Sequence, residues 1–143
     1  MPWPASCGRT SWWACSSAAA AAVGETLAVP SLEVGRDYTY VEDVARGIVA
    51  VLDAPRLPFD TYNVSNGVRY TVAEILDALR DHFAGLRYRV APDDEGVKGS
   101  LGPRTERGPL DPARLFQDCA YRPSYDLEAG LARTMEWLNR IAD

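Results

Sequence analysis

Lysine is almost absent from this sequence, and histidine is equally rare. Lys98 is the only lysine among 143 residues, His82 is the only histidine, and the formal net charge is −5. A net negative chain lacks the basic surface that non-specific nucleic-acid binding requires, so we expect no nucleic-acid partner. No serine or cysteine motif accompanies His82, which we interpret as a surface or half-buried helix residue rather than a catalytic base.

Cysteine is also scarce, with Cys7, Cys15 and Cys119 as its three occurrences. An odd number without metal-ligand spacing argues against a disulfide framework and against a zinc site, so we expect no metal. A reduced, cytoplasmic setting fits best. The apolar run near the start is too short to span a membrane and lacks the charged start of a signal peptide, so we expect no membrane association.

The first 23 residues differ in character from the rest of the chain. They hold three of the four tryptophans and two cysteines beside an alanine run, and show no periodicity before that run. We interpret residues 1–23 as a divergent or poorly ordered segment with a short Ala-rich helix. Residues 24–143 are then expected to form one domain with a core of its own.

Helical periodicity and capping signals predict a mixed α/β fold for that domain. Thr71 and Glu74 form a T-x-x-E capping box, and Asp111 is expected to cap a short helix that begins with Pro112. Asn66-Gly67 is a strong turn signal. The three long helices are predicted over residues 41–53, 72–84 and 127–141, and strands over residues 26–32, 36–41, 61–65 and 86–92.

One glycine pattern imitates a cofactor site. Residues 96–102, "GVKGSLG", fit G-x-x-G-x-x-G. A dinucleotide site needs such a pattern between a strand and the start of a helix, where the helix N-terminus meets the pyrophosphate. Three acidic residues precede this run and Pro103 follows it, so we interpret it as a loop and expect this chain to bind no cofactor by itself.

The stretch "GRDYTYVEDVARG", residues 35–47, carries the most specific chemical signal. Arg36 stands at the end of an extended segment, and Tyr38 and Tyr40 are expected to share its face by the two-residue period of a strand. A guanidinium there can clamp an anion through two parallel hydrogen bonds. The alternative is that Arg36 merely pairs with Asp37 or another surface carboxylate. Asp43, in the first turn of the next helix, suits the helix dipole without any functional role.

Three segments in the same order resemble the NAD-dependent epimerase/dehydratase family of extended short-chain dehydrogenase/reductases. They are "RDYTYVEDVARGIVAVLDAP", "YNVSNGVRYTVAEILDAL" and "RGPLDPARLFQDCAYRPSYDLEAGLARTMEWL". The resemblance implies an α/β, Rossmann-like family, here the C-terminal substrate-binding portion without the N-terminal dinucleotide-binding domain. In "CAYRP" Ala120 replaces the family's usual glycine, which is tolerable if the backbone there is not left-handed.

The resemblance also implies site residues. Arg36 matches the arginine that contacts the diphosphate of a nucleotide-sugar substrate, and Tyr38 accompanies it. A second basic residue comes from the loop before the Asp-capped helix, with Arg104 and Arg107 as candidates and Arg107 favoured.

The family's catalytic signature is missing from the sequence. The family uses a Tyr-x-x-x-Lys pair and a Gly-rich turn with NAD or NADP, and neither is found here. We therefore expect no catalytic residues and a truncated enzyme that binds a nucleotide sugar but is inactive alone. The alternatives are a non-enzymatic binding module, a non-functional remnant, and a split-enzyme subunit. A homodimer, or a missing N-terminal half supplied in trans, would be its protein partner.

Overall fold

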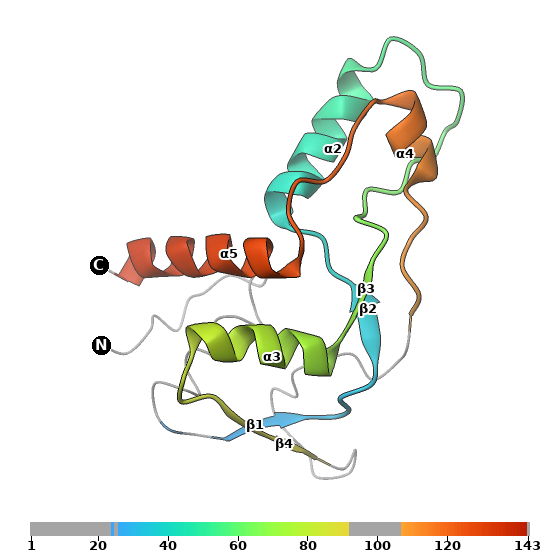
Figure 1. Cartoon of the computed structure of the whole chain (residues 1–143). Coiled ribbons are helices and arrows are strands. Elements are labelled where there is room, and N and C mark those ends of the chain that lie inside the picture. The colour runs from blue at the N-terminus through green and yellow to red at the C-terminus, as the bar shows by residue number, and fades with distance from the viewer. Residues whose placement is uncertain (1–23, 25, 92–106, 143) are drawn as a thin grey trace.

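The computed structural model describes residues 24, 26–91 and 107–142 (Figure 1). Four strands and four helices occur in these ranges. The strands are β1 (Thr26–Val29), β2 (Gly35–Asp37), β3 (Arg69–Thr71) and β4 (Arg87–Val90). The helices are α2 (Val41–Asp53), α3 (Val72–His82), α4 (Ala113–Asp118) and α5 (Leu127–Ala142). The predictions for residues 1–23, which include Cys7 and Cys15, and for Lys98, the 96–102 loop and Arg104 concern residues outside the described ranges.

Two small sheets organise the chain. Strand β1 pairs in parallel with β4, Leu27 opposite Tyr88, whereas β2 pairs antiparallel with β3, Arg36 opposite Tyr70. A parallel pair requires a long crossover, and here the crossover contains β2, α2, β3 and α3. This arrangement confirms the predicted α/β class.

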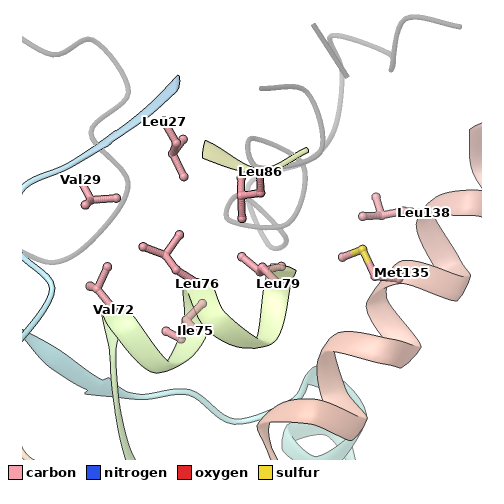
Figure 2. Close-up of a cluster of buried hydrophobic side chains, with 9 residues drawn as sticks. All are labelled: Leu27, Val29, Val72, Ile75, Leu76, Leu79, Leu86, Met135 and Leu138. Carbon is pink, nitrogen blue, oxygen red and sulfur yellow. The ribbon is translucent and has the colours of Figure 1, made fainter. Parts of the chain in front are cut away.

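The hydrophobic core lies around α3. In Figure 1, α3 lies between the β1–β4 pair and α5. Its apolar stripe faces β1 and Leu86 on one side and the α5 residues on the other (Figure 2). The buried cluster consists of Leu27, Val29, Val72, Ile75, Leu76, Leu79, Leu86, Met135 and Leu138. The 3.6-residue period that predicted α3 and α5 therefore also identified the faces that build the core.

Local signals account for the helix ends. Thr71 Oγ1 accepts a hydrogen bond from Glu74 N at 3.2 Å, and the Glu74 carboxylate accepts one from Thr71 N at 2.7 Å, so the capping box forms as predicted. Helix α4 begins at Ala113, one residue later than predicted, and its N-cap is Pro112 rather than Asp111, although the Asp111 carboxylate still accepts from Ala113 N at 2.9 Å. Helix α3 ends at His82, two residues before the predicted end at residue 84.

The strand predicted over residues 61–65 is wrong, and β3 at Arg69–Thr71 was not predicted. Residues 61–65 are held by individual side-chain bonds instead, such as Tyr62 Oη to Asp118 at 2.9 Å and Asn63 Nδ2 to the Asp111 carbonyl at 2.9 Å. Ala120 has φ +50°, so the condition under which alanine was expected to be tolerated at this position is not met.

Helix α2 differs from the other long helices in which of its residues are buried. Its buried residues are Asp43 and Gly47, and none of its side chains belongs to the core cluster. The apolar positions that predicted the helix instead remain exposed, with Leu52 at 77% and Val41 at 62% exposure. In the described residues no helix is long and apolar enough to cross a membrane.

Candidate functional site

Arg36 lies on the short strand β2, as predicted. Its side chain is half-buried and its backbone pairs with Tyr70 across the β2–β3 ribbon. Tyr38 packs partly against the core cluster, and burial raises the pKa of its phenol while the positive charge of Arg36 lowers it in part. The guanidinium and the phenol are therefore close enough to interact electrostatically.

Arg36 does not use Asp37 as an ion-pair partner. Among the described residues, no carboxylate forms an ion pair with Arg36. The Asp37 carboxylate is occupied instead, because it accepts hydrogen bonds from Thr39 Oγ1 at 3.1 Å, from Leu110 N at 3.1 Å and from Ser65 Oγ. The simplest alternative explanation for Arg36, a local salt bridge, finds no support in this part of the chain.

Arg107 lies beside the same strand. Its backbone N–H donates to the Gly35 carbonyl at 3.4 Å, so the segment that leads to α4 runs along β2. Figure 1 shows this segment passing from the level of β2 and β3 towards α4. The Arg107 side chain is exposed, and no described group forms an ion pair with it. Arg36 and Arg107, which were both predicted as site residues and lie 71 positions apart in the sequence, thus have neighbouring backbones.

A third arginine near the site escaped the sequence analysis. Arg69 lies opposite Asp37 in the β2–β3 register, and its Nη2 donates to the Glu33 carbonyl at 2.7 Å. A Cβ atom added at Gly35 would lie 2.9 Å from the Tyr70 carbonyl oxygen and 2.7 Å from the Arg69 guanidinium, so a larger residue there would disturb the paired strand as well as the guanidinium. The glycine directly before Arg36 was the sequence signal for a close neighbour. That neighbour could not be identified as Arg69 because strand β3 was not predicted.

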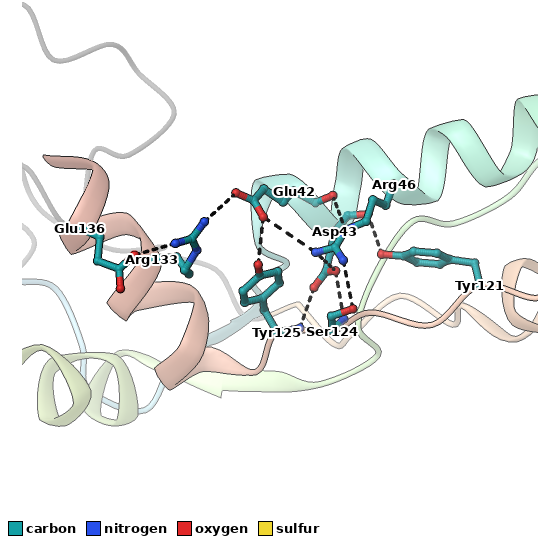
Figure 3. A network of polar contacts seen from close by, with 8 residues as sticks. All are labelled: Glu42, Asp43, Arg46, Tyr121, Ser124, Tyr125, Arg133 and Glu136. Atoms are coloured by element: carbon teal, nitrogen blue, oxygen red, sulfur yellow. Dashed lines mark hydrogen bonds and ion pairs between the residues drawn. The ribbon is translucent and has the colours of Figure 1, made fainter. Parts of the chain in front are cut away.

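Asp43 anchors the helix that follows the site (Figure 3). Its carboxylate is fully buried and accepts from the backbone N–H groups of Ser124 at 3.0 Å and Tyr125 at 2.9 Å. Arg46 reaches it at 3.3 Å, and Tyr121 Oη donates to the Asp43 carbonyl at 2.6 Å. Burial, followed by the charge of Asp43, raises the pKa of Tyr121 to about 12. Asp43 therefore has the structural role predicted for it, and a larger one than a helix-dipole contact.

Tyr40 joins this network rather than the site. Its ring centroid lies 4.6 Å from that of Tyr125, and Gly130 of α5 leaves space for it. Strand β2 ends at Asp37, so the two-residue strand period predicted to place Tyr38 and Tyr40 on the face of Arg36 does not apply beyond Asp37.

A groove between α3 and the start of α5 has an unsuitable charge for anions. It has a volume of about 610 Å³, and carboxylates of both helices and of Asp126 line it. Such a lining repels phosphate groups. Among the described residues, no cluster of histidine, cysteine or acidic side chains has the arrangement of a metal site. The lining residues are Tyr70, Glu74, Asp77, Ala78, Asp81, Asp126, Leu127 and Glu128.

The two remaining reactive side chains lie away from this site. His82 is exposed at the end of α3, in agreement with its prediction as a surface or half-buried helix residue. Cys119 is a half-buried free cysteine, and burial raises the pKa of its thiol, which disfavours the reactive thiolate.

Residues 8–65 match the NAD dependent epimerase/dehydratase family. A dTDP-glucose 4,6-dehydratase from Streptomyces antibioticus is 29% identical over 102 residues, which are 71% of this chain and 29% of the dehydratase. The UDP-glucuronic acid 4-epimerase from Bacillus cereus, solved in complex with UDP-glucuronic acid and NAD, superposes with a TM-score of 0.69 at 17% identity, over 90% of this chain and 40% of the epimerase.

A partial consensus L-threonine 3-dehydrogenase has the same fold. It superposes with a TM-score of 0.69 at 22% identity, over 89% of this chain and 41% of the dehydrogenase. This chain therefore spans less than half the length of these relatives. The resemblance predicted from the three sequence segments is confirmed: the chain is similar to NAD-dependent epimerases and dehydratases, and its α/β fold matches part of these enzymes.

Proposed function

We propose that this chain is the nucleotide-sugar-binding portion of an NAD-dependent epimerase or dehydratase, corresponding to the C-terminal part of such an enzyme. Arg36 would hold the diphosphate through its guanidinium fork, and Arg107 would close on it from the neighbouring segment. The observation that carries the proposal is Arg36 on β2 without a described carboxylate partner, beside the Arg107 backbone. Tyr38 would border the same site, and Arg104 is a further candidate outside the described residues.

The proposed chemistry is recognition rather than reaction. Arginine stays charged at any working pH and matches phosphate oxygens with paired N–H donors. Oxidation of a sugar carbon needs a hydride acceptor and an acid/base pair, and the sequence contains no Tyr-x-x-x-Lys pair. The acid-lined groove does not fit a dinucleotide, so we propose that NAD or NADP is held by the portion of the enzyme that this chain does not cover and that this chain is inactive alone.

A split-enzyme subunit or binding module is the second candidate, and helix α2 favours it. Ile48, Val49 and Leu52 are each at least 50% exposed on a helix whose other side is buried. Contiguous exposed apolar surface marks interaction sites. We propose that this face packs against a cofactor-binding polypeptide carrying the family's Gly-rich turn. Residues 24–143 would then form one domain of a two-part, cytoplasmic enzyme, with residues 1–23 outside it.

Calorimetric titration with UDP-glucose, UDP-glucuronic acid and dTDP-glucose tests the first proposal. A charge-assisted bidentate contact contributes about 1.5–3 kcal/mol. Arg36→Ala should therefore weaken binding by roughly ten- to a hundredfold, at about 1.4 kcal/mol per decade. Arg107→Ala should weaken it as well. Arg69 remains in place and would limit the loss.

Arg56→Ala is the matched control, since Arg56 is an exposed arginine between α2 and β3. It should leave the affinity unchanged. Equal affinities for the wild type and Arg36→Ala would return Arg36 to the role of a surface cation. Failure of the wild type to bind any of the three compounds would contradict the proposed function.

A further inference from the structure

One carboxylate links the segments that carry the candidate arginines. Asp37 directly follows Arg36 on β2, and its Oδ2 accepts a hydrogen bond from the Leu110 N–H at 3.1 Å. Leu110 belongs to the segment that begins with Arg107 and leads to α4. Each carboxylate oxygen has a specific role, because Oδ1 accepts from Thr39 Oγ1 at 3.1 Å.

Ser65 completes the connection from a third segment. Its side chain is 2% exposed and its hydroxyl donates to Asp37 Oδ2, while it accepts from the Gly67 N–H at 2.8 Å. The same hydroxyl oxygen lies 3.3 Å from the Leu110 carbonyl oxygen. A buried hydroxyl with this set of partners has one preferred geometry, because each lost bond would leave a desolvated polar group unpaired.

The carboxylate thereby fixes the position of Arg107. Two hydrogen bonds join the Arg107–Asp111 segment to β2: the Leu110 N–H bond to Asp37 and the Arg107 N–H bond to the Gly35 carbonyl at 3.4 Å. At 3.4 Å the second is the weaker of the two. The Asp37 bond is therefore the stronger of these two links between the segment and the strand that carries Arg36.

We infer that Asp37 is a positioning residue: its carboxylate clamps the Arg107–Asp111 segment against β2 and so sets the spacing between Arg36 and Arg107. The role in ligand binding rests on the proposed function, whereas the clamp itself does not. Asp37 contacts neither guanidinium through a described ion pair, so it acts through the backbone. The adjacent Arg36 and Asp37 would then have two different tasks. Arg36 binds the anion, and Asp37 positions Arg107.

Amide hydrogen exchange of Leu110, followed by NMR, tests the clamp without any ligand. In Asp37→Asn, the exchange of the Leu110 amide should accelerate about tenfold, which corresponds to the loss of one charge-assisted hydrogen bond. The amides of α3 should keep their protection. Asp53→Asn, at the exposed end of α2, is the control and should change neither. Unchanged Leu110 exchange in Asp37→Asn and in Asp37→Ala would overturn the inference, as would equal acceleration throughout α3.

A double-mutant cycle on UDP-glucose affinity tests the positioning role. Asp37→Asn should weaken binding about tenfold in the wild-type background, but less than about twofold when Arg107 is already alanine, because coupled residues are not additive. The same factor in both backgrounds would show that Asp37 acts independently of Arg107. If the wild type binds no nucleotide sugar, the positioning role fails together with the proposed function, and the Leu110 exchange still decides whether the clamp exists.

Discussion

At the scale of single residues, the same chemical group serves different purposes at different places. Asp37 and Asp43 lie six positions apart, and both accept backbone N–H groups from distant segments. Asp43 is fully buried and joins α2 to the connector before α5, whereas Asp37 borders the candidate site. Each carboxylate therefore joins segments that are far apart in the sequence, Asp43 through two backbone N–H bonds and Asp37 through one.

Ala120 carries a conformational cost that one substitution should remove. It follows α4 by two residues and has φ +50°, where a Cβ atom costs about 1–2 kcal/mol. Ala120→Gly should therefore stabilise the protein by about 0.5–1 kcal/mol and raise its melting temperature by about 2–5 °C. Ala45→Gly, in the exposed interior of α2, makes the same chemical change and should instead destabilise by about 1 kcal/mol. Thermal unfolding followed by circular dichroism measures the change in melting temperature of both variants. A lower melting temperature for Ala120→Gly would contradict the strain argument.

At the scale of secondary-structure elements, the helices differ in what stabilises them. Helix α3 has both its capping box and the core stripe. Helix α5 adds two residues to that core, and Tyr40 rests on its Gly130. Helix α2 contributes no core side chain and depends on Asp43, Tyr121 and Arg46 for its attachment. Intrinsic propensity is a weak determinant by comparison.

The α3 capping box should contribute measurably and in a pH-dependent way. Thr71→Ala should destabilise the protein by about 0.5–2 kcal/mol at neutral pH, and Thr61→Ala, in an exposed coil, should have no effect. Hydrogen bonds from the Thr71 backbone amide and then its hydroxyl lower the pKa of Glu74 below its usual 4.5. A lowered folded-state pKa gives stability that is present above pH 4.5 and is lost as the pH falls through the lowered value. The difference between wild type and Thr71→Ala should therefore narrow below about pH 4. Urea unfolding from pH 3 to pH 7 measures it, and a pH-independent difference would exclude a contribution from the charged carboxylate.

At the scale of the whole molecule, the buried core and the apolar surface are separated. The core lies around α3, while the exposed apolar positions of α2 lie at the other end of the β2–β3 ribbon (Figure 1). The candidate arginines lie between these two regions, on and beside β2. The chain spans less than half the length of its solved relatives, and one face of α2 stays exposed in this structure.

The exposed face of α2 should promote association of the isolated chain. Replacing Ile48 and Leu52 together by glutamate should raise solubility and reduce self-association without changing the unfolding free energy by more than about 0.5 kcal/mol, because exposed substitutions have small effects. Val90→Glu changes an apolar residue of comparable exposure, 52%, and should not reproduce the gain. Sedimentation velocity over a concentration series makes the comparison. A wild type that stays monomeric and as soluble as the double variant would argue against an interaction surface on α2.

The sequence by itself determined the three long helices, the α/β class and the resemblance to the epimerase/dehydratase family, since capping residues, apolar periods and motif order are local properties of the chain. It also identified Arg36 and Arg107 as candidates. Only the tertiary structure decided what lies beside them, namely β3 with Arg69 and the Asp37 clamp. Only the structure, too, showed that Ala120 is left-handed. It also decided that most of the apolar stripe of α2 faces solvent. A helical period predicts which residues share a face but not whether that face is buried. The physical reason is the same in each case, because these features depend on contacts between residues far apart in the chain, whose energies no local pattern records.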